Sequence, residues 1–363
     1  MRFFGSLVLL FLGGCNNSSP SASSPSIQTD NEGGSTSSPK VFTDQYSPEV
    51  IESVKYFNRK HSELQTKFAK VSDDDYYRDA CPPFAFRVDG ATVRLGKEIY
   101  NADSSSVYEV AGGTKVIKVT ERESLAMSWR DDAALRTIAK SCVSNIAPKI
   151  GGSNSLPMPC SLRSIVMDFV EGKSLDRLFD NIRLLTLEEM VTMALGALKT
   201  LEQLHSIGLV HGDVHAGNFI FEEKRKKMTL IDFGRAIPYV DESGKHVLKS
   251  WKGLTAAEQD LDLNPLILSI GELKGFAVSR RDDLFRLAEC LVTAFDGQEA
   301  LLDKLSADVY MMPEARVLIA RKVNRRFSNK VPHGFVKLYR ATVNMDFNED
   351  PDYATLASLI QST

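Results

Sequence analysis

The chain has 363 residues, of which 43% are hydrophobic and 25% are charged. This length and composition are sufficient for one large folded domain with a substantial apolar core. The formal net charge of -3 does not indicate the strongly basic surface typical of nucleic-acid-binding proteins, so we expect no nucleic-acid partner. The short basic run at residues 224–227 is interpreted as the solvated tip of a hairpin.

Residues 1–14 have the features of a secretory signal peptide: a positive start, an apolar run and small residues at the end. The apolar run is too short for a transmembrane helix. Leu12-Gly13-Gly14-Cys15 also resembles a bacterial lipobox, in which Cys15 would carry a lipid after cleavage. We therefore expect a secreted or extracellular protein of the secretory pathway, with a membrane-anchored lipoprotein as the alternative.

Two segments of different composition precede the main domain, which we place at residues 91–363. Residues 15–45 consist mostly of Ser, Pro, Gly, Asn and Thr and are predicted to be a disordered tether. Residues 46–90 begin with Ser47-Pro48-Glu49, which is typical of a helix start, and are predicted to be a helical extension. We expect its helix to pack on the smaller part of the domain.

The mature chain would retain four cysteines, Cys81, Cys142, Cys160 and Cys290. An even count permits disulfides in an oxidising compartment without showing which cysteines pair. Cys142 and Cys160 are the expected pair, whereas Cys290 lies in an apolar helical pattern and is expected to be a buried thiol.

Three segments are predicted to be β-strands, residues 95–100, 106–110 and 115–119. The third contains Lys118 among apolar neighbours, where a charged side chain requires an anionic partner. A helix is predicted over residues 121–141, and it contains Asp131 and Asp132. Further on, residues 164–175 form an apolar run followed by an acidic, glycine-containing connector.

The most informative segment is residues 211–234. Asp213 is followed by Asn218, and Asp232 comes after a predicted hairpin of strands 218–222 and 227–231. Asp213 would accept the proton of an attacking hydroxyl group, while Asn218 and Asp232 offer the hard oxygen ligands that Mg²⁺ prefers. Each piece alone is explained by the turn-forming tendency of Asp, Asn and Gly, but their order and spacing together predict phosphoryl transfer.

These residues resemble the catalytic motifs of protein kinases. The resemblance implies an α+β bilobal fold, with a β-rich N-lobe at residues 91–167 and a mainly helical C-lobe at residues 171–363. It implies ATP and Mg²⁺ as cofactors and places Lys118 on the phosphates. It also selects Asp131, four residues before Leu135, as the partner of Lys118, with Asp132 as the second candidate.

The same resemblance assigns the walls of the nucleotide pocket. Val107 would contact the nucleotide, and Met167 would line the back of the adenine pocket. The backbones of Asp168 and Val170 would form hydrogen bonds with the base. A buried strand that ends in a turn before a helix explains residues 164–175 equally well.

The string Ser279-Arg280-Arg281-Asp282-Asp283-Leu284 is similar to the casein kinase 1 and vaccinia-related kinase group. By this resemblance Asp283 would be a buried acid that anchors the catalytic loop. The group also implies a protein substrate with a Ser or Thr acceptor and a monomeric enzyme.

Several positions depart from that pattern. His215 stands where the group has lysine and is typical of small-molecule and bacterial kinases; it would make the charge at the γ-phosphate pH-dependent, unless it is a loop imidazole bonded to backbone. Gly212 replaces an arginine that usually anchors an activation-loop phosphate, so we expect no such switch. The three glycine positions of the phosphate-covering loop hold Tyr100, Ala102 and Ser105, which predicts weaker preorganisation.

Three functions are consistent with these residues. The leading hypothesis is an ATP- and Mg²⁺-dependent serine/threonine protein kinase, secreted or anchored at the surface. A small-molecule kinase on the same fold is favoured by His215 and disfavoured by the long segment 237–281. A pseudokinase binding module is supported only by the poor glycine loop.

Overall fold

The computed structural model describes residues 40–43, 45–68, 85–88, 91–102, 105–110, 112–120, 124–155, 163–247, 268–297 and 315–363. The predicted signal peptide, Cys15, most of the predicted tether, Cys81 and Cys160 lie outside these ranges, so those predictions and the Cys142–Cys160 pairing stay predictions. No helix in the described ranges has the length and apolar character needed to cross a membrane.

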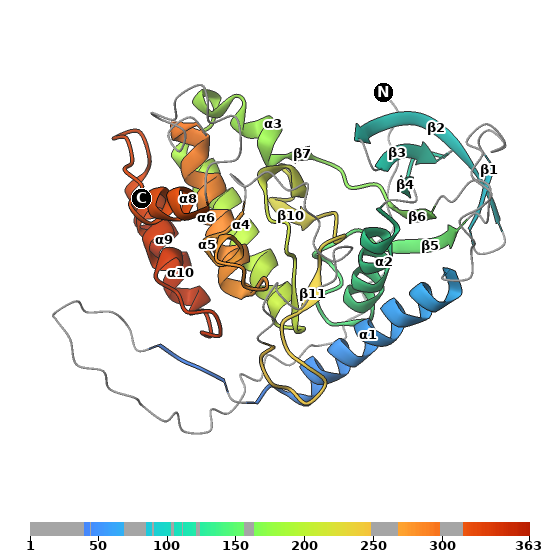
Figure 1. Ribbon diagram of the computed structural model, residues 1–363. Helices are drawn as coiled ribbons and strands as arrows, with labels where there is room; N and C mark the ends of the chain where they lie inside the picture. The colour runs from blue at the N-terminus through green and yellow to red at the C-terminus, as the bar shows by residue number, and fades with distance from the viewer. Residues whose placement is uncertain are drawn as a thin grey trace. The chain divides into compact units, whose positions relative to one another are not determined.

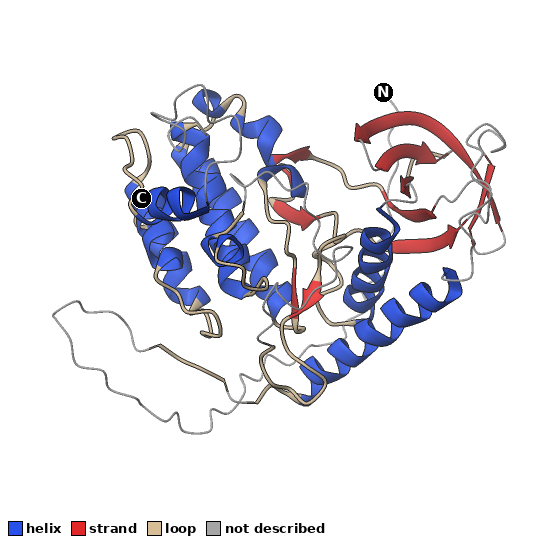
Figure 2. Ribbon diagram, in the orientation of Figure 1, coloured by secondary structure: helices blue, strands red, loops and turns tan. Residues whose placement is uncertain are grey.

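The N-terminal half is built on one antiparallel sheet of six strands, drawn in red in Figure 2. Its spatial order is β1-β2-β3-β4-β6-β5, and the strands are β1 (Ala85–Val88), β2 (Ala91–Ala102), β3 (Ser105–Val110), β4 (Lys115–Thr120), β5 (Ile150–Ser155) and β6 (Arg163–Asp168). The three predicted strands are confirmed within β2, β3 and β4. Strand β1 was not predicted: it lies in the range assigned to the helical extension, yet it pairs with β2.

The two faces of this sheet have different partners because side chains alternate along a strand. Ile117, Val119 and Val166 form an apolar cluster on one face. Lys118 and Ile165, which are paired across β4 and β6, point to the opposite face, where helix α2 (Leu125–Lys140) contacts β5 and β6. This alternation directs Lys118 toward the helix that carries Asp131.

The C-terminal half is mainly helical, which together with the sheet confirms the predicted α+β bilobal fold. Its helices are α3 (Leu175–Phe179), α4 (Leu187–His205), α5 (Ile270–Leu273), α6 (Arg280–Asp296), α8 (Ala315–Val323), α9 (His333–Val343) and α10 (Tyr353–Gln361). Short strands β7 (Lys173–Ser174), β8 (Leu209–Val210), β9 (Phe219–Glu222), β10 (Lys227–Leu230) and β11 (Ile237–Pro238) and the 3₁₀ turns η3 (Ile182–Leu184) and η4 (Ala216–Asn218) complete it. Helix α6, drawn in orange in Figure 1, is buried along most of its length. Its Asp283 carboxylate accepts a hydrogen bond from the backbone N–H of His211 in the loop that follows β8.

Helix α1 (Pro48–Phe68) is the predicted helix of the N-terminal extension. It lies beside α2 in Figure 1, and Phe57 enters the main core with Ala133. The preceding turn of α1 buries Val54 against the C-terminal half, where a Cβ on Gly208 would lie 2.7 Å from the Val54 side chain. The helix therefore packs on the N-lobe, as expected, and on the C-lobe as well.

The residues just before α1 also contact the C-lobe. Lys40 forms an ion pair of 2.7 Å with Asp346, and the backbone N–H of Asp350 donates to the carbonyl of Val41 at 2.8 Å. Residues 40–43 were expected to belong to the disordered tether. The packed part of the chain therefore begins before the predicted boundary at residue 46.

The burial of α1 leads to a test of its contribution to stability. Phe57 is 3% exposed, so Phe57→Ala should lower the free energy of unfolding by about 3–5 kcal/mol, because it removes apolar contacts and leaves a cavity. Glu52→Ala, on the exposed side of the same helix, should change it by less than about 0.5 kcal/mol. Denaturant unfolding of the full chain measures both. Equal effects would contradict the packing of α1.

Candidate active site

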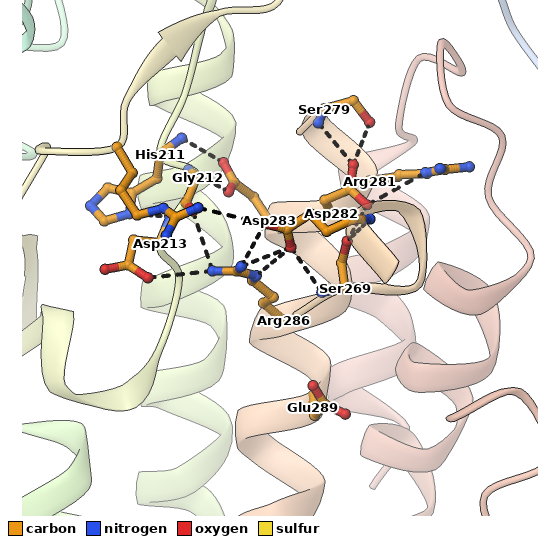
Figure 3. A network of polar contacts seen from close by, with 12 residues as sticks. His211, Gly212, Asp213, Ser269, Ser279, Arg281, Asp282, Asp283, Arg286 and Glu289 are labelled. Atoms are coloured by element: carbon orange, nitrogen blue, oxygen red, sulfur yellow. Dashed lines mark hydrogen bonds and ion pairs between the residues drawn. The ribbon is translucent and has the colours of Figure 1, made fainter. Parts of the chain in front are cut away.

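The predicted catalytic loop, residues 211–218, is fixed by a buried carboxylate on α6. The Asp283 carboxylate, 0% exposed, accepts hydrogen bonds from the backbone N–H groups of His211 at 2.7 Å and Gly212 at 3.0 Å. Burial disfavours the charged carboxylate, but hydrogen bonding from His205 and the loop outweighs it and lowers the pKa of Asp283. The predicted anchoring contact of Asp283 is confirmed (Figure 3).

Gly212 is required by the path of this loop. Its φ is +74°, a conformation that favours glycine, and a Cβ would lie 2.6 Å from the carbonyl oxygen of Arg235. An arginine at this position would need a different backbone. The backbone at this position therefore favours glycine over the usual arginine.

Asp213 and Asn218 are joined within the same loop. The side-chain amide of Asn218 donates to the Asp213 carbonyl at 2.9 Å, which leaves the Asn218 amide oxygen as the group able to bind a cation. His215 accepts a hydrogen bond from the Gly217 N–H at its Nδ1, so a neutral ring carries its proton on Nε2. That Nε2 lies 3.9 Å from Asp213 Oδ2.

Both sequence-based interpretations of His215 are compatible with this geometry. The ring is bonded to the loop backbone, and it also faces Asp213, next to the predicted position of the γ-phosphate. Burial lowers the pKa of His215 despite the attraction of the Asp213 carboxylate. The side chain keeps 45% of its surface exposed, so solvent and a substrate can still reach the ring.

Asp232 occupies a strained position after β10. Its φ is +61°, which is uncommon for a residue other than glycine and is found at functional sites. The next residue, Phe233, is buried with its ring 5.0 Å from that of His211, and its N–H donates to Asp131 Oδ1 at 3.1 Å. This contact links the Asp-Phe-Gly segment to α2.

Ion pairs of Lys118 link the N-lobe to the C-lobe. Its Nζ lies 3.0 Å from Asp131 Oδ2 on α2 and 2.7 Å from Asp232 Oδ1. Burial alone would lower the pKa of Lys118, but the two carboxylates outweigh it and raise the pKa above the ordinary value. Burial raises the pKa of Asp131. Burial also acts to raise the pKa of Asp232, but the Lys118 ammonium outweighs it and lowers that pKa.

Asp132, the second candidate for the partner of Lys118, has other contacts. Its carboxylate forms ion pairs with Arg163 on β6 and, at 2.5 Å, with Arg136 one turn along α2. The structure therefore brings Asp131, and not Asp132, to Lys118.

The segment that would cover the phosphates differs from the predicted loop. The β2–β3 ladder continues through Tyr100–Val107 to Ala102–Ser105, so only residues 103–104 lie between the paired strands. The expected loop over residues 100–106 is largely two strands, and its glycine positions are strand residues.

The same register places the Tyr100 side chain on a face of the sheet that was not predicted from the sequence. Tyr100 is paired with Val107, and Val107 with Lys118, so the three side chains share one face of the sheet. Tyr100 is 58% exposed and available to a ligand. The signal that could have found it is the strand register, which a short hairpin determines.

The hinge residues lie in β6 and just after it. Met167 pairs with Val116 on β4 and with Ile150 on β5. The N–H of Asp168 already donates to the Lys149 carbonyl at 3.0 Å, and its side chain pairs with Lys115 at 2.7 Å. The Asp168 carbonyl is thus the group that would accept from a base, and contact of adenine with Met167, Asp168 and Val170 stays a prediction.

Two further residues near Asp213 were not predicted, Arg286 and Glu272. Arg286 Nη1 lies 3.4 Å from Asp213 Oδ1, and its Nη2 lies 2.7 Å from Glu272 Oε2. The signal was a helix spacing: Arg286 is three residues after Asp283 and so lies on the same side of α6.

Comparison with known proteins agrees with this geometry. A family profile described as ABC1 atypical kinase-like domain matches residues 158–262. This match and the curated relatives below support the assignment of the chain to the protein kinase-like superfamily. Its catalytic loop, Asp-Phe-Gly segment and Lys118 pairing are therefore kinase-like features on a kinase-like fold.

Three curated relatives show the range of kinase-like proteins that the chain resembles. It is 26% identical over 199 residues to probable serine/threonine-protein kinase FPV212 of fowlpox virus, covering 52% of this chain and 60% of the relative. It is 30% identical over 212 residues to casein kinase 1-like protein HD16 of Oryza sativa subsp. japonica, covering 54% and 27%. It is 26% identical over 174 residues to pseudokinase OPG198 of vaccinia virus, covering 47% and 57%. The chain thus matches less than two thirds of the length of each.

The contact of Lys118 with the buried Asp131 and the partly exposed Asp232 gives a test by unfolding. Lys118→Met should lower the free energy of unfolding by about 3 kcal/mol at pH 7, because it leaves the Asp131 carboxylate buried without its cation. Adding Asp131→Asn should recover at least about half of that loss, since the stranded charge is removed. Denaturant unfolding of the two variants measures this.

Lys115→Met is the matched control in the same strand. Lys115 and Asp168 form an ion pair with side chains that are 43% and 42% exposed, so its removal should cost less than about 1 kcal/mol. Equal losses of stability in the two lysine variants would contradict a buried Lys118–Asp131 ion pair.

Proposed function

We propose that this protein is a serine/threonine protein kinase that uses ATP and Mg²⁺. The observation that supports it most strongly is the convergence of Lys118 from the N-lobe with Asp232 from the C-lobe at 2.7 Å. A lysine poised for phosphates, a metal-binding carboxylate and a base on the neighbouring loop are the groups that phosphoryl transfer needs.

The donor set fits Mg²⁺. Asn218 offers its amide oxygen, because its nitrogen is used by the Asp213 carbonyl, and Asp232 has a second carboxylate oxygen besides the one at Lys118. Mg²⁺ takes few protein ligands and prefers such hard oxygens. When bound, the ion would neutralise charge on the phosphate oxygens.

Side chains of the protein would orient the phosphates and accept the proton. Lys118, held by Asp131, would orient the phosphates. Asp213 would accept the proton of a Ser or Thr hydroxyl as that oxygen forms a bond to the γ-phosphorus, while the bond from the γ-phosphorus to the bridging oxygen breaks and ADP leaves. Tyr100 and Val107 would contact the nucleotide from the sheet. His215 would form a hydrogen bond to the γ-phosphate from Nε2.

The substrate class and location rest on the sequence. Similarity to casein kinase 1-like protein HD16 supports a protein acceptor, and residues 1–15 support export, either as a secreted monomer or with a lipid at Cys15. We propose no nucleic-acid partner.

Two observations favour other functions on the same fold. His215 in place of lysine favours a small-molecule acceptor. The short β2–β3 hairpin, together with the similarity to pseudokinase OPG198, favours a binding module without transfer.

Phosphate transfer from labelled ATP by the full chain tests the proposal. The acceptors are the chain itself, casein and a peptide library, and Asp213→Asn should reduce labelling by about 100-fold or more, because the proton acceptor is lost. Asp346→Asn, an exposed carboxylate that contacts Lys40, is the control and should label normally.

The outcomes separate the three functions. Labelled Ser or Thr that depends on Asp213 supports the protein kinase. Magnesium-dependent ATP binding without protein labelling would contradict it in favour of a small-molecule kinase, and no binding would favour a scaffold.

A further inference from the structure

Arg286 is a buried cation that contacts the catalytic loop from α6. Its side chain is 2% exposed, and Nη1 donates to the Gly212 carbonyl at 3.3 Å and to Asp213 Oδ1 at 3.4 Å. Figure 3 shows one carboxylate oxygen of Asp213 directed at Arg286 and the other directed away from it. Arg286 thus touches the predicted base without being exposed to a substrate.

Glu272 on α5 determines where Arg286 points. Its carboxylate accepts from Arg286 Nε at 3.1 Å and from Nη2 at 2.7 and 2.8 Å, a two-pronged geometry that fixes the guanidinium plane. Glu272 is itself held, because it accepts from the Ser269 N–H at 2.8 Å and caps the start of α5. The direction of Arg286 is therefore set before any substrate binds.

This arrangement gives the two carboxylate oxygens of Asp213 different neighbours. Oδ1 is held by Arg286, while Oδ2 faces the side where His215 Nε2 lies at 3.9 Å. A carboxylate with one oxygen held presents the other in a fixed direction to an incoming hydroxyl. The contacts at 3.3 and 3.4 Å are long, as catalytic hydrogen bonds often are before the reactants bind.

We propose that Arg286 is a positioning residue for Asp213 and that Glu272 holds Arg286 in place. The inference rests on the proposed phosphoryl transfer, with Asp213 as its base. Because Arg286 is buried and acts through Asp213, its loss should reduce turnover without changing nucleotide affinity.

The test removes both charges together. Arg286→Gln alone would leave the buried Glu272 carboxylate with only Arg235, at 3.9 Å, as a cation and could unfold the protein, so the variant carries Glu272→Gln as well. In this double variant kcat should fall about 10–100-fold, while KM for ATP stays within about twofold of the wild-type value. Thermal melts confirm that the variant is folded.

A second buried ion pair on the same helix provides the matched control. Glu289 and Lys322 lie 2.5 Å apart, with side chains that are 10% and 0% exposed, and neither contacts Asp213 in the described structure. Glu289→Gln with Lys322→Gln should leave kcat at the wild-type level. An equal loss of kcat in both double variants would show a general loss of packing and overturn the inference.

A mutant cycle with Asp213→Asn decides whether Arg286 acts through the base. In that background the Glu272→Gln and Arg286→Gln changes should cause no further loss of kcat, whereas a multiplied loss would contradict the inference. Arg286→Lys with Glu272 intact should restore part of the turnover.

The outcomes separate this inference from the proposed function. If the wild type transfers phosphate and the double variant is fully active, only this inference is refuted. If the wild type transfers no phosphate, both the proposed function and this inference are refuted.

Discussion

The hydrogen bonds of the Asp283 carboxylate control the geometry of the C-lobe site. A buried carboxylate is costly unless donors surround it, and Asp283 has the N–H groups of His211 and Gly212 and the ring of His205 at 2.9 Å. His205 is held in turn by the Tyr353 hydroxyl at 2.5 Å. Burial lowers the pKa of His205, so the neutral ring donates to Asp283 from one nitrogen and accepts from Tyr353 at the other. Helices α4, α6 and α10 thus converge on the start of the catalytic loop.

Contacts of Lys118 connect this part of the C-lobe to the N-lobe. Asp232 and Phe233 follow the hairpin that begins at Asn218, and they reach Lys118 and Asp131 respectively. A shift of α2 would therefore disturb the lysine and the Asp-Phe-Gly backbone together. Helix α1 restrains that shift, because Phe57 packs with α2 residues while Val54 packs with the C-lobe.

Local motifs could be predicted from the sequence, and long-range pairings could not. The order Asp213, Asn218, Asp232 lies within one short segment, so its spacing alone indicates the chemistry, and Lys118 was identified because a strand lysine among apolar residues needs a counter-charge. Strand β1 and the contact of Lys40 with Asp346 depend on partners distant in sequence or on weak local patterns. The Arg286–Glu272 pair joins α5 to α6 through two residues 14 positions apart, and the spacing along α6, which relates Arg286 to Asp283, does not indicate Glu272 as its partner. The β2–β3 hairpin was misjudged because a glycine pattern was expected where strand pairing continues.

In the proposed function, Asn218, Asp232 and Lys118 form one Mg²⁺ and ATP site between the sheet and the predicted catalytic loop. A crystal structure with Mg²⁺ and a non-hydrolysable ATP analogue is the sharpest test of this site. We expect a metal ion bound by oxygens of Asn218 and Asp232 at about 2.0–2.1 Å, with a phosphate beside Lys118 and the adenine base near Met167. A nucleotide bound elsewhere, or a metal ion that does not contact either side chain, would contradict it.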